Sequence, residues 1–205
     1  MNFWDRMYRS ERYRYGVKPN DFVKESVEKL LDSGRLSLGA SAVDVAAGEG
    51  RNAVYLAEMG LATVAVDQSQ IGVEKTLSLA ARREVELQAI RSDIFHWTPE
   101  QPFDLVVSTF LHVREPGQES VLRRLEELTA LGGYLLAEFF HPDQRINGYG
   151  SGGPPEPEMM VTAELAESTL TNCELLINRS LERELKEGKG HRGKGVVTQI
   201  LARRV

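Results

Sequence analysis

Two glycines and the segment around them have the residue types that bind a nucleotide-like ligand. Gly48 and Gly50 follow the apolar run "SAVDVAA" and precede a segment with helical periodicity that begins at Arg51. Glycine lets a ligand approach the backbone where a Cβ would collide. The free N–H groups at the start of the following helix attract negatively charged groups. The stretch "GEGRN" is therefore predicted to be a ligand-binding loop.

Two carboxylates strengthen this prediction, because each closes one of the next two predicted strands. Asp67 ends "ATVAVD", where a carboxylate is placed to bind the two hydroxyls of a ribose. Asp93 follows the third strand in "RSDIF", where it could accept a hydrogen bond from the amino group of adenine while Ile94 packs on the ring. Together these residues predict a site for an adenosine-containing ligand.

NAD is the alternative ligand, because Gly48, Gly50 and Ala53 also match the pattern G-x-G-x-x-A. Three features count against NAD. Glu49 puts a carboxylate where a pyrophosphate would lie, and the loop follows an N-terminal helix instead of opening the domain. The chain also ends in a predicted antiparallel hairpin and not in a second mononucleotide-binding half. An NAD-dependent oxidoreductase is thus the less favoured reading.

The elements that must position these residues alternate between strand and helix. Apolar runs predict strands at 41–47, 62–67, 85–93, 103–112 and 132–141. Helical spacing and capping residues predict helices at about 21–33, 51–59, 69–83, 118–131 and 162–170. Alternation at this length indicates a doubly wound α/β fold, with a mostly parallel Rossmann-like sheet and helices on both faces.

The two ends of the chain depart from this alternation. Residues 1–20 are rich in aromatics, have no clear periodicity, and are predicted to form a lid-like segment over the ligand, with Gly16 as a hinge. The Gly/Pro-dense stretch 147–157 is predicted to be a loop. Residues 173–204 predict an antiparallel hairpin with a flexible, basic tip at "EGKGHRGKG", which completes a sheet of seven strands. A single domain over 1–205, with a ligand-binding core at 41–140, is expected.

Composition limits the class of protein. The chain is 41% hydrophobic and 27% charged, which is ordinary for a globular protein, and its net charge of −5 argues against a broad nucleic-acid footprint. No apolar run reaches the length of a membrane span, and the N-terminal residues lack the pattern of a secretory signal. Cys173 is the lone cysteine, which fits a cytoplasmic location. A small-molecule substrate and a monomer or homodimer are expected, with no nucleic acid or membrane partner.

The ordered motifs resemble those of class I S-adenosylmethionine-dependent methyltransferases. The resemblance rests on "VDVAAGEGRNAVYLA", "AVDQS", "RSDIF", "FDLVVSTF" and "LGGYLLAEFF". The stretches "FWDRMYRSERYRYGVKPNDFV" and "EGKGHRGKGVVTQILARR" are similar to the tellurite-resistance and thiopurine-methyltransferase-like branch. The resemblance therefore spans nearly the whole chain. One residue departs from it, because Ala46 stands where many members have glycine.

The resemblance implies S-adenosyl-L-methionine as the cofactor and gives each motif a role. Asp44, Gly48 and Gly50 would hold the amino-acid end, and Thr109 with Phe110 would border the methionine part. The cofactor-binding set implied in this way is Asp44, Gly48, Gly50, Asn52, Asp67, Gln68, Asp93, Ile94 and Thr109.

Methyl transfer is an in-line displacement, for which the protein supplies alignment and a dry pocket. A base is needed only if the acceptor must lose a proton, and a soft acceptor such as a thiol, selenium or tellurium compound would need none. No catalytic residue is assigned on this basis, and no metal site is expected, because no histidine pair has short ligand spacing. The candidate substrate-pocket residues are Tyr15, His112, His141, Arg145 and His191, with Trp4, Tyr8, Arg114 and Arg192 on the same predicted segments. The expected function is a small-molecule methyltransferase, with a non-catalytic cofactor-binding or regulatory module as the alternative.

Overall fold

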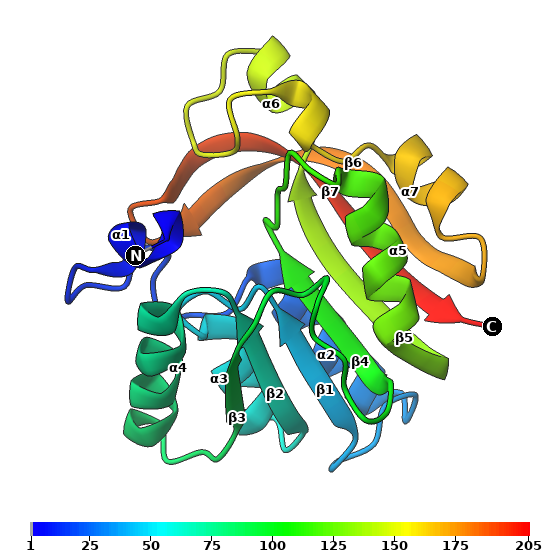
Figure 1. Cartoon of the computed structure of the whole chain (residues 1–205). Helices are drawn as coiled ribbons and strands as arrows, with labels where there is room; N and C mark the ends of the chain where they lie inside the picture. Colours follow the sequence, from blue (N-terminus) through cyan, green and yellow to red (C-terminus); the bar gives the residue numbers. More distant parts are fainter. Residues whose placement is uncertain (1) are drawn as a thin grey trace.

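A computed structural model of the chain describes residues 2–205; Met1, which the predicted N-terminal segment includes, lies outside them. Over this range a seven-stranded sheet forms, in the order β3-β2-β1-β4-β5-β7-β6 (Figure 1). The strands are β1 (Ser41–Val45), β2 (Ala62–Asp67), β3 (Gln88–Arg91), β4 (Phe103–Thr109), β5 (Thr129–Phe140), β6 (Cys173–Glu187) and β7 (His191–Arg204). The predicted fold class is confirmed.

The first five strands run parallel, and the strand order reverses between β1 and β4. Val43, Val106 and Leu135 are completely buried in neighbouring strands, as expected for a sheet covered on both faces. In an open sheet of this type, ligands bind beyond the carboxyl ends of the strands at the reversal point. The loop that contains Gly48 begins directly after β1, at this point.

Helices cover both faces of the sheet (Figure 1). On one face lie α2 (Asp21–Asp32), α3 (Arg51–Glu58) and α4 (Gln70–Arg82), and on the other lie α5 (Gln118–Leu128) and α7 (Ala163–Thr169). The predicted caps are in place, because Asn20 and Ser69 accept hydrogen bonds from backbone N–H groups in the first turns of α2 and α4. None of the helices in residues 2–205 is both long and apolar enough to cross a membrane.

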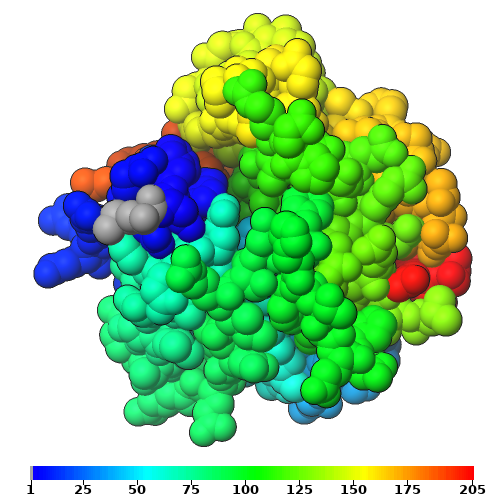
Figure 2. All heavy atoms as spheres, in the orientation of Figure 1, coloured from blue at the N-terminus to red at the C-terminus, as the bar shows by residue number. Residues whose placement is uncertain are grey.

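The C-terminal hairpin places β7 between β5 and β6, antiparallel to both. The predicted flexible tip is shorter than expected, because the β6–β7 ladder continues to the pair Glu187 and His191. The turn is also fixed by the N-terminal segment (residues 2–16): the N–H groups of Lys189 and Gly190 both donate to the carbonyl of Arg14. Figure 2 shows this segment in dark blue beside the orange hairpin.

The N-terminal segment contains a helix that periodicity did not predict, α1 (Phe3–Tyr8). The N-terminus of α1 is closed by a capping box. The Asn2 side chain accepts from the Asp5 N–H, and the Asp5 side chain accepts from the Asn2 N–H. Two further short helices, α6 (Asp143–Ile146) and the 3-10 helix η1 (Pro157–Met159), flank the predicted Gly/Pro loop. Helices of one or two turns are too short to produce a recognisable apolar period.

Candidate active site

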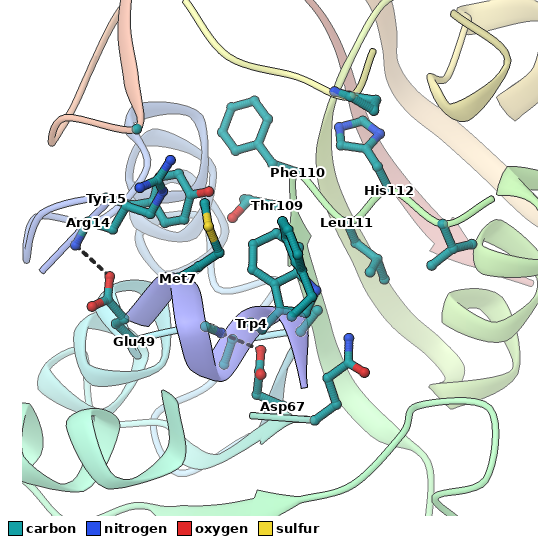
Figure 3. A pocket seen from close by; sticks show the side chains of 18 of the residues that line it. Trp4, Met7, Arg14, Tyr15, Glu49, Asp67, Thr109, Phe110, Leu111 and His112 are labelled. Carbon is teal, nitrogen blue, oxygen red and sulfur yellow. Dashed lines mark hydrogen bonds between the residues drawn. The ribbon is translucent and has the colours of Figure 1, made fainter. Parts of the chain in front are cut away.

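A cavity of about 670 Å³ lies at the carboxyl edge of the sheet, at the reversal point between β1 and β4. Its walls come from the loops after β1, β2, β3, β4 and β5, from the start of α3, and from the N-terminal segment. Figure 3 shows Asp67 at one end of the cavity and Phe110 and His112 at the other, with Trp4 and Met7 of α1 between them. This volume is in the range of small-molecule sites.

The glycine loop is tied to the second strand through Asp67. One carboxylate oxygen accepts from the Gly48 N–H and the other from the Ser69 N–H, both at 2.8 Å. Asp67 is buried, and burial raises its pKa to about 6 against the opposing effect of these hydrogen bonds. Its side chain lines the cavity, so a ligand with hydroxyl donors can reach it.

Asp44 lies beneath the loop and does not line the cavity. Its Oδ2 accepts from the Ala53 N–H at 3.1 Å, which fixes the first turn of α3. Burial raises the pKa of this carboxyl to about 7, and Oδ1 has no hydrogen-bond partner among residues 2–205. Asp44 therefore positions the loop from below.

Ala46 has a positive φ of 56°, a region that side chains with a Cβ enter at a cost of about 1–2 kcal/mol. Glycine adopts this conformation without that cost, which explains in physical terms why glycine suits the position. Ala46 lines the cavity, so the strain lies within the site. Gly50 also has a positive φ, but it does not line the cavity: a Cβ there would lie 2.5 Å from the Thr76 hydroxyl oxygen of α4.

Glu49 fastens the N-terminal segment to the glycine loop. Its Oε2 accepts from the Arg14 N–H at 2.7 Å, and its Oε1 pairs with the Lys75 ammonium at 2.5 Å. Lys75 also donates to the carbonyls of Tyr8, Ser10 and Arg12. The carboxylate that argued against a pyrophosphate in the loop thus holds the chain that covers the cavity.

A buried network of polar side chains lies behind the cavity wall. Asn52 donates to the Thr109 hydroxyl at 3.0 Å, and both residues line the cavity. Arg51, also at the wall, pairs with Glu187 at 2.7 Å, and the Nη1 of this arginine has no partner among the described residues. Asn20 and Arg183 connect Glu187 with the fully buried Glu138 of β5, and Gln199 also donates to Glu138.

The end of the cavity away from Asp67, which we call the aromatic end, is formed by Tyr15, Phe110, Phe140, His191, Met159 and residues 152–155. The His191 ring lies 4.5 Å from the Tyr15 ring, 4.3 Å from Phe110 and 5.2 Å from Phe140. A Cβ on Gly152 would lie 2.6 Å from Cδ2 of His191, so glycine lets this loop contact the imidazole edge. The aromatic end therefore holds His191 in a fixed orientation.

His112 lines the cavity, but both of its ring nitrogens are engaged. Nδ1 donates to the Met159 carbonyl at 2.7 Å, and Nε2 accepts from the Phe140 N–H at 3.4 Å. Burial lowers its pKa to about 4, so the ring is neutral. His112 connects η1 to the end of β5.

Two of the candidate substrate residues lie away from the cavity. His141 accepts from the Asp143 N–H, and Arg145 donates to the carbonyls of Gly153 and Pro154. The prediction placed them on the correct loop, but their side chains turn toward that loop and not into the site. Arg114 and Arg192 are also absent from its wall, and within residues 2–205 no group of three or more histidine, cysteine, aspartate or glutamate side chains is arranged to hold a metal.

Several cavity residues were not singled out from the sequence. Met7, Arg14, Met159 and residues 152–155 all line the wall. Met7 follows Trp4 by three positions, and this spacing puts both on one face of α1. For the others, no local pattern in the sequence signals the contact.

Comparison with known proteins agrees with this geometry. Residues 42–133, which run from β1 to the start of β5, match the family model described as "Methyltransferase domain". This part of the chain, which contains the glycine loop and Asp67, is similar to a methyltransferase domain.

The chain is also similar to "Probable S-adenosyl-L-methionine-dependent methyltransferase TehB" of Haemophilus influenzae (strain 10810), at 22% identity over 52% of this chain and 38% of that protein. A second similar protein is "Hemagglutinin 1" of Eikenella corrodens, at 29% identity over 56% of this chain and 36% of the relative. The chain thus matches less than half the length of these curated relatives. The predicted resemblance to the tellurite-resistance-like branch is confirmed.

Solved methyltransferase structures share the fold. The crystal structure of TehB from Haemophilus influenzae superimposes with a TM-score of 0.69 and 19% identity, covering 99% of this chain and 66% of that chain. Magnesium protoporphyrin IX methyltransferase from Synechocystis PCC 6803, with SAH bound, gives a TM-score of 0.70 and 16% identity, covering 98% and 94%.

The cavity residues suit S-adenosylmethionine, the predicted cofactor, chemically. Asp67 offers a buried carboxylate at the end of β2, and Asp93 offers a half-exposed one after β3. Gly48 lines the cavity without a side chain, and the Tyr8 hydroxyl lies 3.0 Å from where its Cβ would be. The cavity thus has acceptors for hydroxyl and amino donors.

Proposed function

We propose that the chain transfers a methyl group from S-adenosylmethionine to a small molecule whose acceptor atom is soft, a thiol sulfur or a related chalcogen. The observation that carries the proposal is the division of one cavity into a polar end at Asp67 and an aromatic end at Phe110 and His191. The polar end suits the cofactor, and the aromatic end suits an apolar, polarisable acceptor.

At the polar end, each residue has a defined part in this proposal. Asp67 would bind the ribose hydroxyls, and Asp93 would accept from the adenine amino group while Ile94 packs on the ring. Gln68 borders the ribose, and the backbone around Gly48 approaches the amino-acid end. Asn52 and Thr109, joined by their hydrogen bond, would border the methionine part, with Asp44 and Gly50 holding the loop in shape.

When bound, the cofactor supplies an activated methyl group on a sulfonium. The chain's own residues would align the acceptor and exclude water. Trp4, Met7 and Tyr15 close the cavity from the N-terminal side, and Phe140 is fully buried behind the aromatic end. A chamber of this kind favours a compact acceptor over a polymer. A small-molecule partner, and no nucleic acid or membrane, is therefore part of the proposal.

An acceptor panel tests the proposal. Purified protein would be incubated with S-adenosylmethionine and a series of thiols, thioethers, selenite, tellurite, amines and phenols, and released S-adenosylhomocysteine would be measured. Turnover confined to the sulfur, selenium and tellurium members is expected. Turnover confined to amines or phenols would overturn the acceptor class. Tight cofactor binding with no turnover across the panel would instead favour the non-catalytic module.

A further inference from the structure

His191 is a buried imidazole for which the proposed roles above provide no function. It lies at the start of β7, is 7% exposed, and lines the aromatic end of the cavity. Its Nδ1 lies 3.6 Å from a carboxylate oxygen of Glu187 and has no hydrogen-bond partner among residues 2–205. An imidazole backed by a carboxylate and facing a reaction cavity has the arrangement of a general base.

The contacts around His191 fix the direction of the ring. Tyr15, Phe110 and Phe140 pack against it, and Gly152 contacts it at Cδ2. Because Nδ1 faces the Glu187 carboxylate, that nitrogen is the one to carry a proton in the neutral ring. Nε2, on the other side of the imidazole, is then the nitrogen with a free lone pair for a molecule in the cavity.

The charges near His191 balance when the ring is neutral. They come from several elements: Glu187 and Arg183 of β6, Arg51 of α3, Glu138 of β5, His112 after β4, and Tyr15 of the N-terminal segment. The two carboxylates are matched by the two guanidinium groups. Burial lowers the pKa of His191, and Glu187 opposes that effect. A neutral imidazole, able to take up a proton, is therefore the resting form at neutral pH.

We propose that His191 is the general base of the reaction and that the acceptor is a thiol or other chalcogen that still carries its proton. This inference rests on the proposed function and deepens it. An aliphatic thiol is mostly protonated at neutral pH, and only the thiolate is strongly nucleophilic.

In the proposed step, Nε2 of His191 takes the S–H proton and the acceptor sulfur uses its electron pair to bond to the methyl carbon. The electron pair of the broken methyl–sulfur bond stays on the cofactor sulfur. The products are a thioether, S-adenosylhomocysteine and a protonated His191. Glu187 stabilises the positive ring at 3.6 Å, and the proton is then lost to water.

The test compares His191→Phe, which keeps an aromatic ring among Tyr15, Phe110 and Phe140, with the wild-type chain on two acceptors. For an aliphatic thiol at pH 7, kcat/KM is expected to fall about 10²–10⁴-fold. The loss should shrink as pH rises and the thiol ionises on its own. For a strongly acidic aryl thiol, already a thiolate at pH 7, the variant should keep most of its activity. His141→Phe, outside the cavity, is the matched control and should leave both activities unchanged.

Two measurements that do not depend on turnover complete the test. Calorimetry with S-adenosylhomocysteine should give the same affinity for His191→Phe and wild type, which shows that the fold and cofactor site are intact. Nitrogen NMR of the wild-type imidazole should show a neutral ring protonated at Nδ1 at pH 7. An equal loss of kcat/KM on both thiols, or a ring protonated at Nε2, would overturn the assignment of His191 as the general base. If the wild type binds cofactor but uses no thiol, the proposed function fails and not the role of His191 alone.

Discussion

The carboxylate of Glu49 and the backbone N–H of Arg14 form a 2.7 Å hydrogen bond that joins the cofactor loop to the chain that covers it. The same carboxylate pairs with Lys75, whose ammonium group holds three carbonyls of residues 8–12. The glycine loop and the N-terminal segment are thus one connected unit. A change at Glu49 should act on both.

Glu49→Gln should weaken this connection, because the amide cannot neutralise the Lys75 ammonium. We expect a loss of about 1–3 kcal/mol in the free energy of unfolding, together with faster hydrogen exchange in residues 2–16. Glu28→Gln is the control: its pair with Lys24 is exposed, and its loss should cost less than about 1 kcal/mol. Equal losses in urea denaturation of the two variants would show that the Glu49 contacts do not stabilise the fold.

Gly48→Ala should lower cofactor affinity and disturb α1. A Cβ at Gly48 would lie 3.0 Å from the Tyr8 hydroxyl oxygen, so the variant acts on the covering helix as well as on the ligand. Gly34→Ala is the control, because it has a similar positive φ but no atom within 4 Å of the added carbon. Both should lose about 1 kcal/mol of stability from backbone strain, but only Gly48→Ala should change the titration with S-adenosylhomocysteine.

Ala46→Gly should stabilise the chain by up to about 1–2 kcal/mol, by relieving the positive φ of residue 46. In a helix, replacing alanine by glycine has the opposite effect and lowers stability. Ala81→Gly, on the exposed side of α4, is therefore the control and should lower the free energy of unfolding by up to about 1 kcal/mol. Thermal unfolding of the two variants measures the difference. If both lose stability, the left-handed conformation at Ala46 carries no strain.

Cofactor affinity should depend on pH through Asp67, whose pKa burial raises to about 6. In the proposed site, the ribose hydroxyls would donate to the ionised carboxylate, so binding should be strongest above pH 7. It should weaken by up to roughly tenfold per pH unit below about pH 6. Asp67→Asn should bind weakly at every pH, with a flatter profile. A wild-type profile that stays flat from pH 5 to 8 would contradict the role of this carboxyl.

The same pKa makes a separate prediction for the cofactor-free chain. Because the folded-state value lies above the unfolded value of 3.8, the contribution of Asp67 to stability is fully present below about pH 3.8 and is lost as pH rises through 6. Asp67→Asn removes this dependence. The asparagine keeps one acceptor oxygen, so one of the two N–H contacts is lost. At pH 8 the variant should lose less stability than this broken contact alone would predict, which urea denaturation at pH 5 and pH 8 can measure.

The N-terminal segment is expected to respond unevenly to cofactor. Arg14 is fixed to the β6–β7 turn by two backbone hydrogen bonds, whereas Trp4 and Met7 of α1 line the cavity. We expect hydrogen exchange in residues 3–8 to slow when S-adenosylhomocysteine binds, while residues 14–16 are protected already. Equal protection of α1 with and without ligand would make it a fixed wall and not a lid.

The sheet was predictable because each core element carries its own signal. The strand at Ser41–Val45 has apolar residues at 42, 43 and 45 and is buried from residue 42 onward, and Asn20 and Ser69 cap their helices as their residue types predict. The polar end of the cavity was predictable for the same reason: Asp67 and Asp93 follow strands whose carboxyl ends meet at one edge.

The aromatic end was predictable only in part, because non-local contacts shape it. His191 and Tyr15 were candidates, but their stacking depends on the hairpin reaching the N-terminal segment. His141 and Arg145 share a loop with cavity residues, yet backbone partners within that loop turn their side chains away. Residue type and sequence position do not reveal such partners.

The backbone hydrogen bonds of Arg14 with Lys189 and Gly190 also constrain the order in which parts of the chain can fold during synthesis. During synthesis, the strands and loops that hold the cofactor emerge well before the hairpin does. The aromatic end must wait until β6 and β7 have left the ribosome, since its wall needs both ends of the chain. Contacts of such high sequence separation form late and slowly. A nascent chain could therefore hold the methyl donor before it has any chamber in which to use it.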